Sequence, residues 1–462
     1  MQAPALPQSF DSLEQLTDDL TDFIQTSLVR QITGGVHVND AFIEDAWGKL
    51  PAEWTRHWDS LPDSRIAQRE MIDSIDEDKR TRQPDGHESA PSRPGGSLIS
   101  WLEKLKSVSL PRSQRKGPAL TLPKVLTDRM EPKKLNEVSV AAPYVHSICQ
   151  ASGVTHVIDM GSGQGYLSNT LAYLFPSLRI LAIDGSESQI DGSKAFATSL
   201  GITGDRVQHL VRYIDGSMTL AAEIDAWAGG QKCLLVGLHA CGNLSEHMLK
   251  YFATCPSITH LAAVGCCYNH ILMRSDTCPD GFPISERLRR QNVTLTPTAL
   301  MASCQAPNNW ARTDLAKLKS IYSRKQFYRS LLEKMLHDKG VQINDKPNWG
   351  IRKSDLANFE RFTRRAVESL GVEQNKISNM DITEYENRYA SHEGRISILW
   401  TLSVLCCKAI ESVIALDRYW FLVEHGAHNV DIVPIFEYKI SPRNLMMVAE
   451  KRHKCLDIGI KE

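Results

Sequence analysis

The 462-residue chain lacks several features that mark secreted, membrane-bound or strongly nucleic-acid-binding proteins. Its formal net charge is only −1, so no general attraction to nucleic acid or an anionic membrane is indicated. No Lys or Arg precedes Arg30, which argues against a secretory or mitochondrial presequence. The longest apolar run, 396–407, is too short to cross a bilayer. We therefore expect an intracellular protein, cytoplasmic or nuclear, with no membrane partner.

The cysteines lack the spacing of a zinc finger. None of the 11 forms a Cys-x-x-Cys pair. The adjacent pairs Cys266-Cys267 and Cys406-Cys407 lie in apolar runs, which is typical of buried free thiols. Free thiols fit a reducing compartment, and no metal site is expected.

A glycine-rich stretch, 155–165, organises the middle of the chain. A short β-branched run leads to Asp159, then to Gly161, Gly163 and Gly165 at every second position, and a helical pattern follows at once. Glycines let a backbone pass close to a ligand, and the amides at a helix start face it. The pattern predicts a strand, a tight turn and a helix N-terminus around a bound ligand.

The glycine spacing excludes other nucleotide-binding motifs. The dinucleotide pattern Gly-x-Gly-x-x-Gly fails at Tyr166, and the phosphate loop is absent. Asp-x-Gly-x-Gly-x-Gly after a strand instead resembles motif I of class I S-adenosylmethionine (SAM) methyltransferases. A second strand ends in Asp184, an acid suited to accepting ribose hydroxyl protons. The expected SAM-binding residues here are Asp159, Gly161, Ser162, Gly163, Gly165 and Asp184, and the alternative is a Rossmann-like domain that has lost its ligand.

Strands and helices alternate regularly after residue 155, which implies a parallel sheet with helices on both faces. An apolar pair near the C-terminus, 430–437 and 445–450, is expected to add an antiparallel hairpin to the same sheet. The predicted fold class is α/β, a Rossmann-like class I methyltransferase with a seven-stranded sheet, a helical N-terminal region and a long insertion after strand 5. The five parallel strands are expected over 155–160, 179–184, 207–214, 232–238 and 258–267.

Composition divides the chain into four segments. Residues 1–75 are expected to be a helical N-terminal region, and 76–118 a polar and basic linker. Residues 119–275 with 395–462 would form the SAM-binding domain, and 276–394 a mostly helical inserted cap over the substrate. Basic residues gather over 104–134, where they would grip phosphates or simply lie in solvent.

The segment after strand 4, Val236-Gly-Leu-His-Ala-Cys-Gly-Asn-Leu-Ser245, is expected to face the transferable methyl group. His239 is suited to contact the ligand or act as a general base, since the pKa of histidine lies near physiological pH. Asn243 would orient a substrate amide or base edge. Cys241 as a nucleophile is a weaker alternative. Structural roles are equally open, with Ser245 capping the next helix.

Strand 5 is followed by two further candidates. Tyr268 would stack on a planar substrate, and His270 would reach the site. Adenine N6 methylation is disfavoured, because no Asp/Asn-Pro-Pro-Tyr/Phe motif follows strand 4.

Five motifs together resemble the methyltransferase-like protein 25 family, whose paralogues are named for a ribosomal RNA adenine dimethylase domain. The resemblance covers about residues 120–462, with departures at Asn136, where a His is expected, and Gln164, where Lys is common. It implies a SAM-binding methyltransferase domain, and it adds Lys133, Glu137 and His239 to the cofactor-binding candidates. The motifs are Met130-x-Pro-Lys-Lys-x-x-Glu-Val, Asp159-x-Gly-Ser-Gly-x-Gly, Gly237-Leu-His-x-Cys-Gly-x-Leu-Ser, Val264-Gly-Cys-Cys-Tyr and Ile440-Ser-Pro-Arg-Asn-Leu445.

The predicted function is direct, SAM-dependent methyl transfer to RNA (tRNA or rRNA) or protein. RNA is a lead because the segment after strand 4 also resembles that of tRNA 2′-O-methyltransferases. The alternative is a catalytically degenerate SAM-binding or scaffold protein that acts by interaction. An oxidoreductase is disfavoured by the glycine spacing. If RNA is the substrate, Arg112, Arg115 and Lys116 are expected to contact its phosphates.

Overall fold

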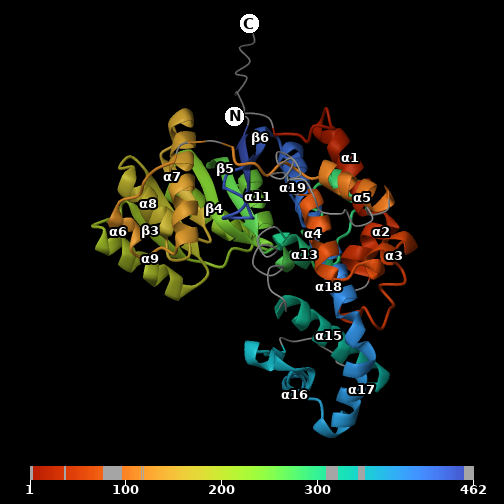
Figure 1. The fold of residues 1–462 in the computed structure, drawn as a ribbon. Helices are drawn as coiled ribbons and strands as arrows, with labels where there is room; N and C mark the ends of the chain where they lie inside the picture. Colours follow the sequence, from red (N-terminus) through yellow and green to blue (C-terminus); the bar gives the residue numbers. More distant parts are fainter. Residues whose placement is uncertain are drawn as a thin grey trace. The chain divides into compact units, whose positions relative to one another are not determined.

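The computed structural model describes residues 4–35, 38–75, 96–115, 117, 119–307, 321–341 and 349–451. About half of the predicted linker, including residues 76–95 and Lys116, lies outside these residues. The chain forms two compact units. Figure 1 labels many of their helices and strands. The first, here the sheet unit, comprises Met1–Thr21, Leu110–Leu295 and Glu411–Glu462, and the second, the helical unit, comprises Asp22–Ser109 and Thr296–Ile410. The segment boundaries inferred from composition stay predictions.

The sheet unit contains a seven-stranded sheet in the order β3-β2-β1-β4-β5-β7-β6. The first five strands are parallel, and β7 lies antiparallel between β5 and β6. The prediction that the C-terminal pair completes the sheet is therefore confirmed. The strands are β1 (His156–Met160), β2 (Arg179–Asp184), β3 (Val207–Val211), β4 (Cys233–Cys241), β5 (Ile258–Cys266), β6 (Ala427–Pro434) and β7 (Leu445–Lys451).

Strand order reverses between β1 and β4, which neighbour each other at the centre of the sheet. In open α/β sheets, ligands bind beyond the carboxyl ends of the strands at such a switch point. The central strands are buried apolar runs, because helices cover both faces of a parallel sheet. The helices of this part are α7 (Pro132–Ser152), α8 (Tyr166–Leu174), α9 (Glu187–Ser199), α10 (Met218–Ala228) and α11 (Leu244–Thr254).

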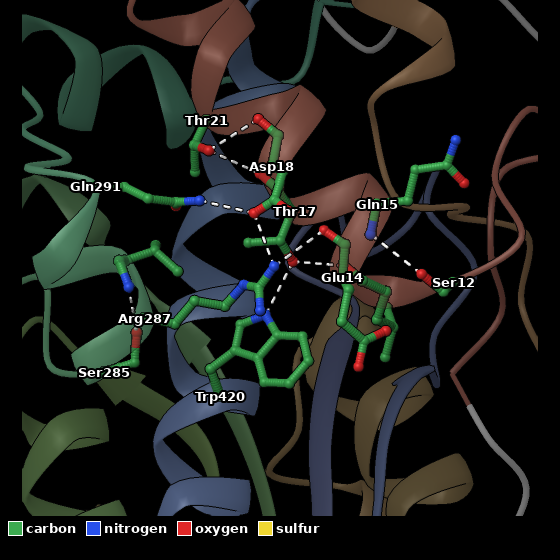
Figure 2. Close-up of polar contacts among 12 residues, drawn as sticks. Ser12, Glu14, Gln15, Thr17, Asp18, Thr21, Ser285, Arg287, Gln291 and Trp420 are labelled. Atoms are coloured by element: carbon green, nitrogen blue, oxygen red, sulfur yellow. Dashed lines mark hydrogen bonds and ion pairs between the residues drawn. The ribbon is translucent and has the colours of Figure 1, made fainter.

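The N-terminal turns of α1 (Leu13–Ile24) are fixed to the rest of the sheet unit by the polar contacts in Figure 2. Arg287 and Gln291 each donate to Asp18 Oδ1 over 2.7 Å. The Trp420 indole N–H donates to Thr17 Oγ1 over 2.9 Å, and the Arg287 guanidinium lies 4.7 Å from the Trp420 ring centroid. Thr17 and Asp18 belong to α1, and Trp420 belongs to α19 (Cys407–Glu424). Arg287 lies in α12 (Glu286–Arg290), and Gln291 caps the C-terminus of that helix.

The helical unit has its own apolar core, formed largely by the helices between 321 and 405. One stretch, Asn379–Glu424, is by length and composition apolar enough to cross a membrane, but 83% of its most apolar window is buried, as in a core helix. The main helices are α3 (Ala52–Ser60), α4 (Ser64–Ile75), α5 (Gly96–Ser107), α13 (Pro297–Ser303), α15 (Ile321–Asp338), α16 (Phe359–Ser369), α17 (Asn379–Tyr389) and α18 (Glu393–Leu405).

Candidate functional site

The turn after β1 depends on three glycines in the left-handed region, Gly161, Gly163 and Gly165, with φ of +69°, +54° and +69°. Residues with a Cβ adopt this conformation only at a cost of about 1–2 kcal/mol. A Cβ at Gly161 would lie 2.9 Å from Leu244 Cδ2, and one at Gly165 would collide with Ser193. At Gly163 the nearest atom would be 3.7 Å away. Packing therefore excludes a Cβ at Gly165 and crowds one at Gly161, whereas Gly163 leaves the backbone accessible to a ligand.

The carboxylate of Asp184 connects the ends of β1 and β2. Its Oδ2 accepts the Gly163 amide over 2.9 Å, and its Oδ1 accepts the Ser186 amide over 2.9 Å. The side chain is only half-buried, and each carboxylate oxygen has a further lone pair. The Asp184 carboxylate is thus held at the switch point, and its remaining lone pairs can accept hydrogen bonds from a ligand.

Two other residues of motif I lie deeper. Asp159 is 3% exposed and accepts a 2.6 Å hydrogen bond from Ser168 Oγ in α8. Burial raises the pKa of Asp159 to about 6. The Ser162 hydroxyl is buried and has no hydrogen-bond partner among the described residues. Asp159 therefore fixes the first turns of α8, and its direct contact with SAM stays a prediction.

Glu137, in the second turn of α7, lies at the centre of a second polar cluster. It is almost fully buried: its Oε2 lies 3.0 Å from His239 Nε2, and its Oε1 accepts the Ser441 hydroxyl over 2.7 Å. Lys134 Nζ and Lys133 Nζ lie 3.4 Å and 3.7 Å from its carboxylate. Burial alone would raise the pKa of Glu137, but His239, Ser441 and Lys134 lower it to about 2. The carboxylate is therefore firmly ionised.

This cluster joins three segments that are distant in the sequence: α7, the end of β4 and the connection between β6 and β7. The structure brings together the predicted residues Lys133, Glu137 and His239. Sequence reasoning missed Lys134 and Ser441, although both stand inside the motifs that carry the family resemblance. The His239 side chain is 39% exposed, so an anchored imidazole faces the carboxyl edge of the sheet.

Asn243 has a structural contact. Its Oδ1 accepts the Leu272 amide over 2.7 Å and so holds the segment after β5. Asn243 also occupies the N-cap position of α11, so the expected capping by Ser245 is wrong. Gly242 is required at φ +50°, since a Cβ there would lie 2.7 Å from the backbone oxygen of His270. A role for Asn243 in orienting a substrate stays a prediction.

The expected stacking of Tyr268 on a substrate is wrong. Tyr268 is only 2% exposed, and its hydroxyl donates to Glu411 Oε1 over 2.8 Å. The same Glu411 forms an ion pair of 2.7 Å with Arg112, whose side chain is 1% exposed. Arg112 therefore supports the interior of the sheet unit and cannot contact RNA phosphates. The second basic candidate, Arg115, is ion-paired with buried Asp431.

Three thiols meet at the carboxyl ends of β4 and β5. Cys241 Sγ lies 3.1 Å from Cys266 Sγ, and Cys266 Sγ lies 3.7 Å from Cys267 Sγ. Hydrogen bonding from Cys266 outweighs burial and lowers the pKa of Cys241 to about 6. Cys266 is buried as expected, but Cys267 is half-exposed and Cys241 exposed.

Comparison with known proteins covers the part of the chain that holds the glycine turn, Glu137, His239 and the three thiols. A family model described as a methyltransferase domain matches residues 133–274. "Probable methyltransferase-like protein 25" of Mus musculus is 28% identical over 239 residues, which cover 50% of this chain and 39% of that protein. The protein of the same name from Homo sapiens is 28% identical over 235 residues, covering 48% and 38%. The match thus spans well under half the length of these relatives.

Solved methyltransferase structures also match. Magnesium protoporphyrin IX methyltransferase from Synechocystis PCC 6803, with bound SAH, is 14% identical with a TM-score of 0.22, covering 37% of this chain and 70% of that one. Coclaurine N-methyltransferase, bound to N-methylheliamine and SAH, is 12% identical with a TM-score of 0.23, covering 95% and 97%. The class I arrangement is carried by the strand order itself. The chain is a homologue of methyltransferase-like protein 25, as its motifs predicted, and contains a SAM-dependent methyltransferase domain.

Proposed function

We propose that this chain binds SAM beyond the carboxyl ends of β1, β2 and β4 and transfers its methyl group to a nucleophile of RNA or protein. The observation that carries the proposal is the 2.9 Å hydrogen bond from the Gly163 amide to Asp184, which joins the glycine turn to the tip of β2. The open backbone at Gly163 also fits a ligand with polar groups, as does the buried Ser162 hydroxyl, which has no partner in the part of the chain that the structure describes.

The residues of this chain divide the binding task. Asp184 would accept the ribose hydroxyls, and the amides of the Gly161–Gly165 turn would approach the ligand closely. Lys133, whose side chain is 58% exposed, would pair with the carboxylate of the methionine part. Glu137 would fix His239 and Lys134 at the same edge.

SAM supplies an activated methyl group, so the protein mainly has to position and deprotonate the acceptor. His239 would take the proton from an acceptor hydroxyl or nitrogen. Glu137, 3.0 Å from its Nε2, would orient the imidazole and offset the positive charge of the imidazolium and of Lys134, whose Nζ lies 2.5 Å from the same nitrogen. This carboxylate–histidine pair favours an acceptor that loses a proton, such as a ribose 2′-hydroxyl or a protein side-chain nitrogen.

The experiment is calorimetric titration of the purified protein with SAM. Asp184→Ala should abolish binding, whereas Asp191→Ala should not, because Asp191 is an exposed acid of α9 that forms a surface ion pair with Lys194 over 3.6 Å. A folded wild-type protein that does not bind SAM would overturn the proposal.

Methyl transfer is tested next, with labelled SAM and separate RNA and protein fractions of a cell extract. Label in one fraction identifies the acceptor class, and His239→Ala should remove the label even at a saturating concentration of SAM. Binding without transfer to either fraction would favour the alternative, a SAM-binding scaffold that acts by interaction.

A further inference from the structure

Three cysteines converge at the carboxyl edge of the sheet, outside the residues assigned to SAM. Cys241 ends β4 and Cys266 ends β5, and the two are direct partners in the parallel ladder. Partnered residues of neighbouring strands project to the same face of a sheet. The register therefore places their sulfur atoms side by side, 3.1 Å apart.

The third thiol is added by an unusual turn. Cys267 has φ +40° and ψ 48°, a left-handed conformation that is costly for a residue with a Cβ and that gathers at functional sites. This turn keeps Cys267 Sγ 3.7 Å from Cys266 Sγ. All three sulfur atoms lie within 4.8 Å of one another.

These separations suit a shared metal ion better than a disulfide. Thiolates bind zinc at about 2.3 Å, so two of them in a tetrahedral site are about 3.8 Å apart. A disulfide would need about 2.05 Å and would leave the third thiol without a role. Soft thiolate ligands in tetrahedral geometry bind zinc or iron–sulfur clusters, and such clusters are usually held by four cysteines, so three thiols fit zinc better.

We propose that Cys241, Cys266 and Cys267 bind Zn²⁺, with the fourth coordination position open to solvent. Cys241 is exposed and Cys267 half-exposed, so a metal ion and a further ligand can reach the cluster. Zinc sites with three protein ligands keep the fourth position for water or a substrate atom. Here that position would take water, or a nitrogen or sulfur donor of an incoming molecule.

The site lies next to the proposed catalytic base but does not depend on it. His239 precedes Cys241 by two residues on β4, so both side chains belong to the same strand end. The cofactor site uses β1 and β2 instead. Metal binding and SAM binding are therefore separately measurable.

The first test is the metal content of the full chain, produced without a polyhistidine tag and kept reduced, by mass spectrometry of the elements. We expect one equivalent of zinc per chain. Cys241→Ser, Cys266→Ser and Cys267→Ser should each lower it strongly. Cys278→Ser is the matched control, because Cys278 is another half-exposed free thiol of the sheet unit that does not belong to the cluster.

A serine variant that folds poorly would also lose metal, so the wild-type protein provides an independent measurement. Removing metal with a chelator should expose these three thiols to alkylation, and adding zinc back should protect them. Cobalt substitution should give the visible bands of a tetrahedral thiolate site, and added imidazole should shift them. Bands that imidazole does not move would overturn the open fourth position.

Two results would overturn the metal site itself. One is a wild-type protein that neither contains zinc nor takes it up after reduction. The other is a Cys241–Cys266 disulfide in protein that was alkylated at lysis, which would make the pair a redox couple. Titration of the metal-free protein with SAM, followed by calorimetry, tests the cofactor site separately from the metal site. If SAM still binds, the cofactor assignment holds whatever the metal analysis shows.

Discussion

Replacing Glu137 with Gln tests whether an ionised carboxylate holds the α7–β4 cluster together. The substitution keeps the size of the side chain and a hydrogen-bonding group for Ser441, but it removes the charge beside His239 and Lys134. We expect a less stable sheet unit and a less ordered His239.

The magnitude follows from the pKa of Glu137, which is lowered from 4.5 to about 2 in the fold. At about 1.4 kcal/mol for each pKa unit, the ionised group stabilises the fold by about 3 kcal/mol. A remaining hydrogen bond from Ser441 is worth about 1 kcal/mol, so Glu137→Gln should cost about 2 kcal/mol at pH 7. Because the folded-state pKa is the lower one, the stabilisation is present above pH 4.5 and is lost as the pH falls toward 2.

The assay is urea unfolding followed by circular dichroism at a series of pH values. Glu223→Gln is the control, since Glu223 pairs with Arg212 at the surface over 3.1 Å and should contribute less than about 0.5 kcal/mol. The deficit of Glu137→Gln should shrink as the pH falls below 4.5. Wild-type stability of this variant at pH 7, or a deficit that does not change with pH, would refute the reasoning.

Three further substitutions test other parts of the structure. Glu411→Leu leaves the buried Arg112 without its 2.7 Å partner, which should cost about 3–5 kcal/mol of unfolding free energy, and a loss below 1 kcal/mol would contradict the buried pair. Gly163→Ala should cost about 1–2 kcal/mol but weaken SAM binding at least tenfold in calorimetry, because the methyl group fills the open side of the turn. Asp18→Ala removes the acceptor of Arg287 in Figure 2, so hydrogen exchange over residues 13–21 should become faster, and unchanged exchange would refute the docking role.

The sheet could largely be predicted because its signals are local. Strand β2 covers 179–184 as predicted, and the other parallel strands differ from prediction only at their ends. Regular alternation of apolar strands and helices implies a parallel order, and the remaining apolar pair had to be β6 and β7. The glycine turn was predictable for the same reason, since its φ values follow from adjacent residues.

The polar clusters could not be predicted, because they depend on pairing between distant segments. Glu137 and His239 are 102 residues apart, and only the placement of α7 across the end of β4 joins them. Burial is equally non-local. Arg112 belongs to a basic stretch that looked solvent-exposed, but it is buried against Glu411 from α19. The thiol cluster has no metal-binding spacing, since strand register, and not a short loop, brings Cys241 to Cys266.

The end of β4 shows why both proposed activities depend on one small stretch of backbone. The β4–β5 ladder is irregular between Gly237 and Ala240, and regular pairing resumes with Ala240–Gly265 and Cys241–Cys266. Such irregularities re-aim side chains near active sites, and a shift of one residue moves every side chain to the other face. Gly265 has to be small, because a Cβ there would collide with the buried guanidinium of Arg418. The pairing of Ala240 and Cys241 therefore brings the thiols together, whereas the irregular segment before it carries His239 toward Glu137, so the proposed base and the proposed metal ligand stand two residues apart.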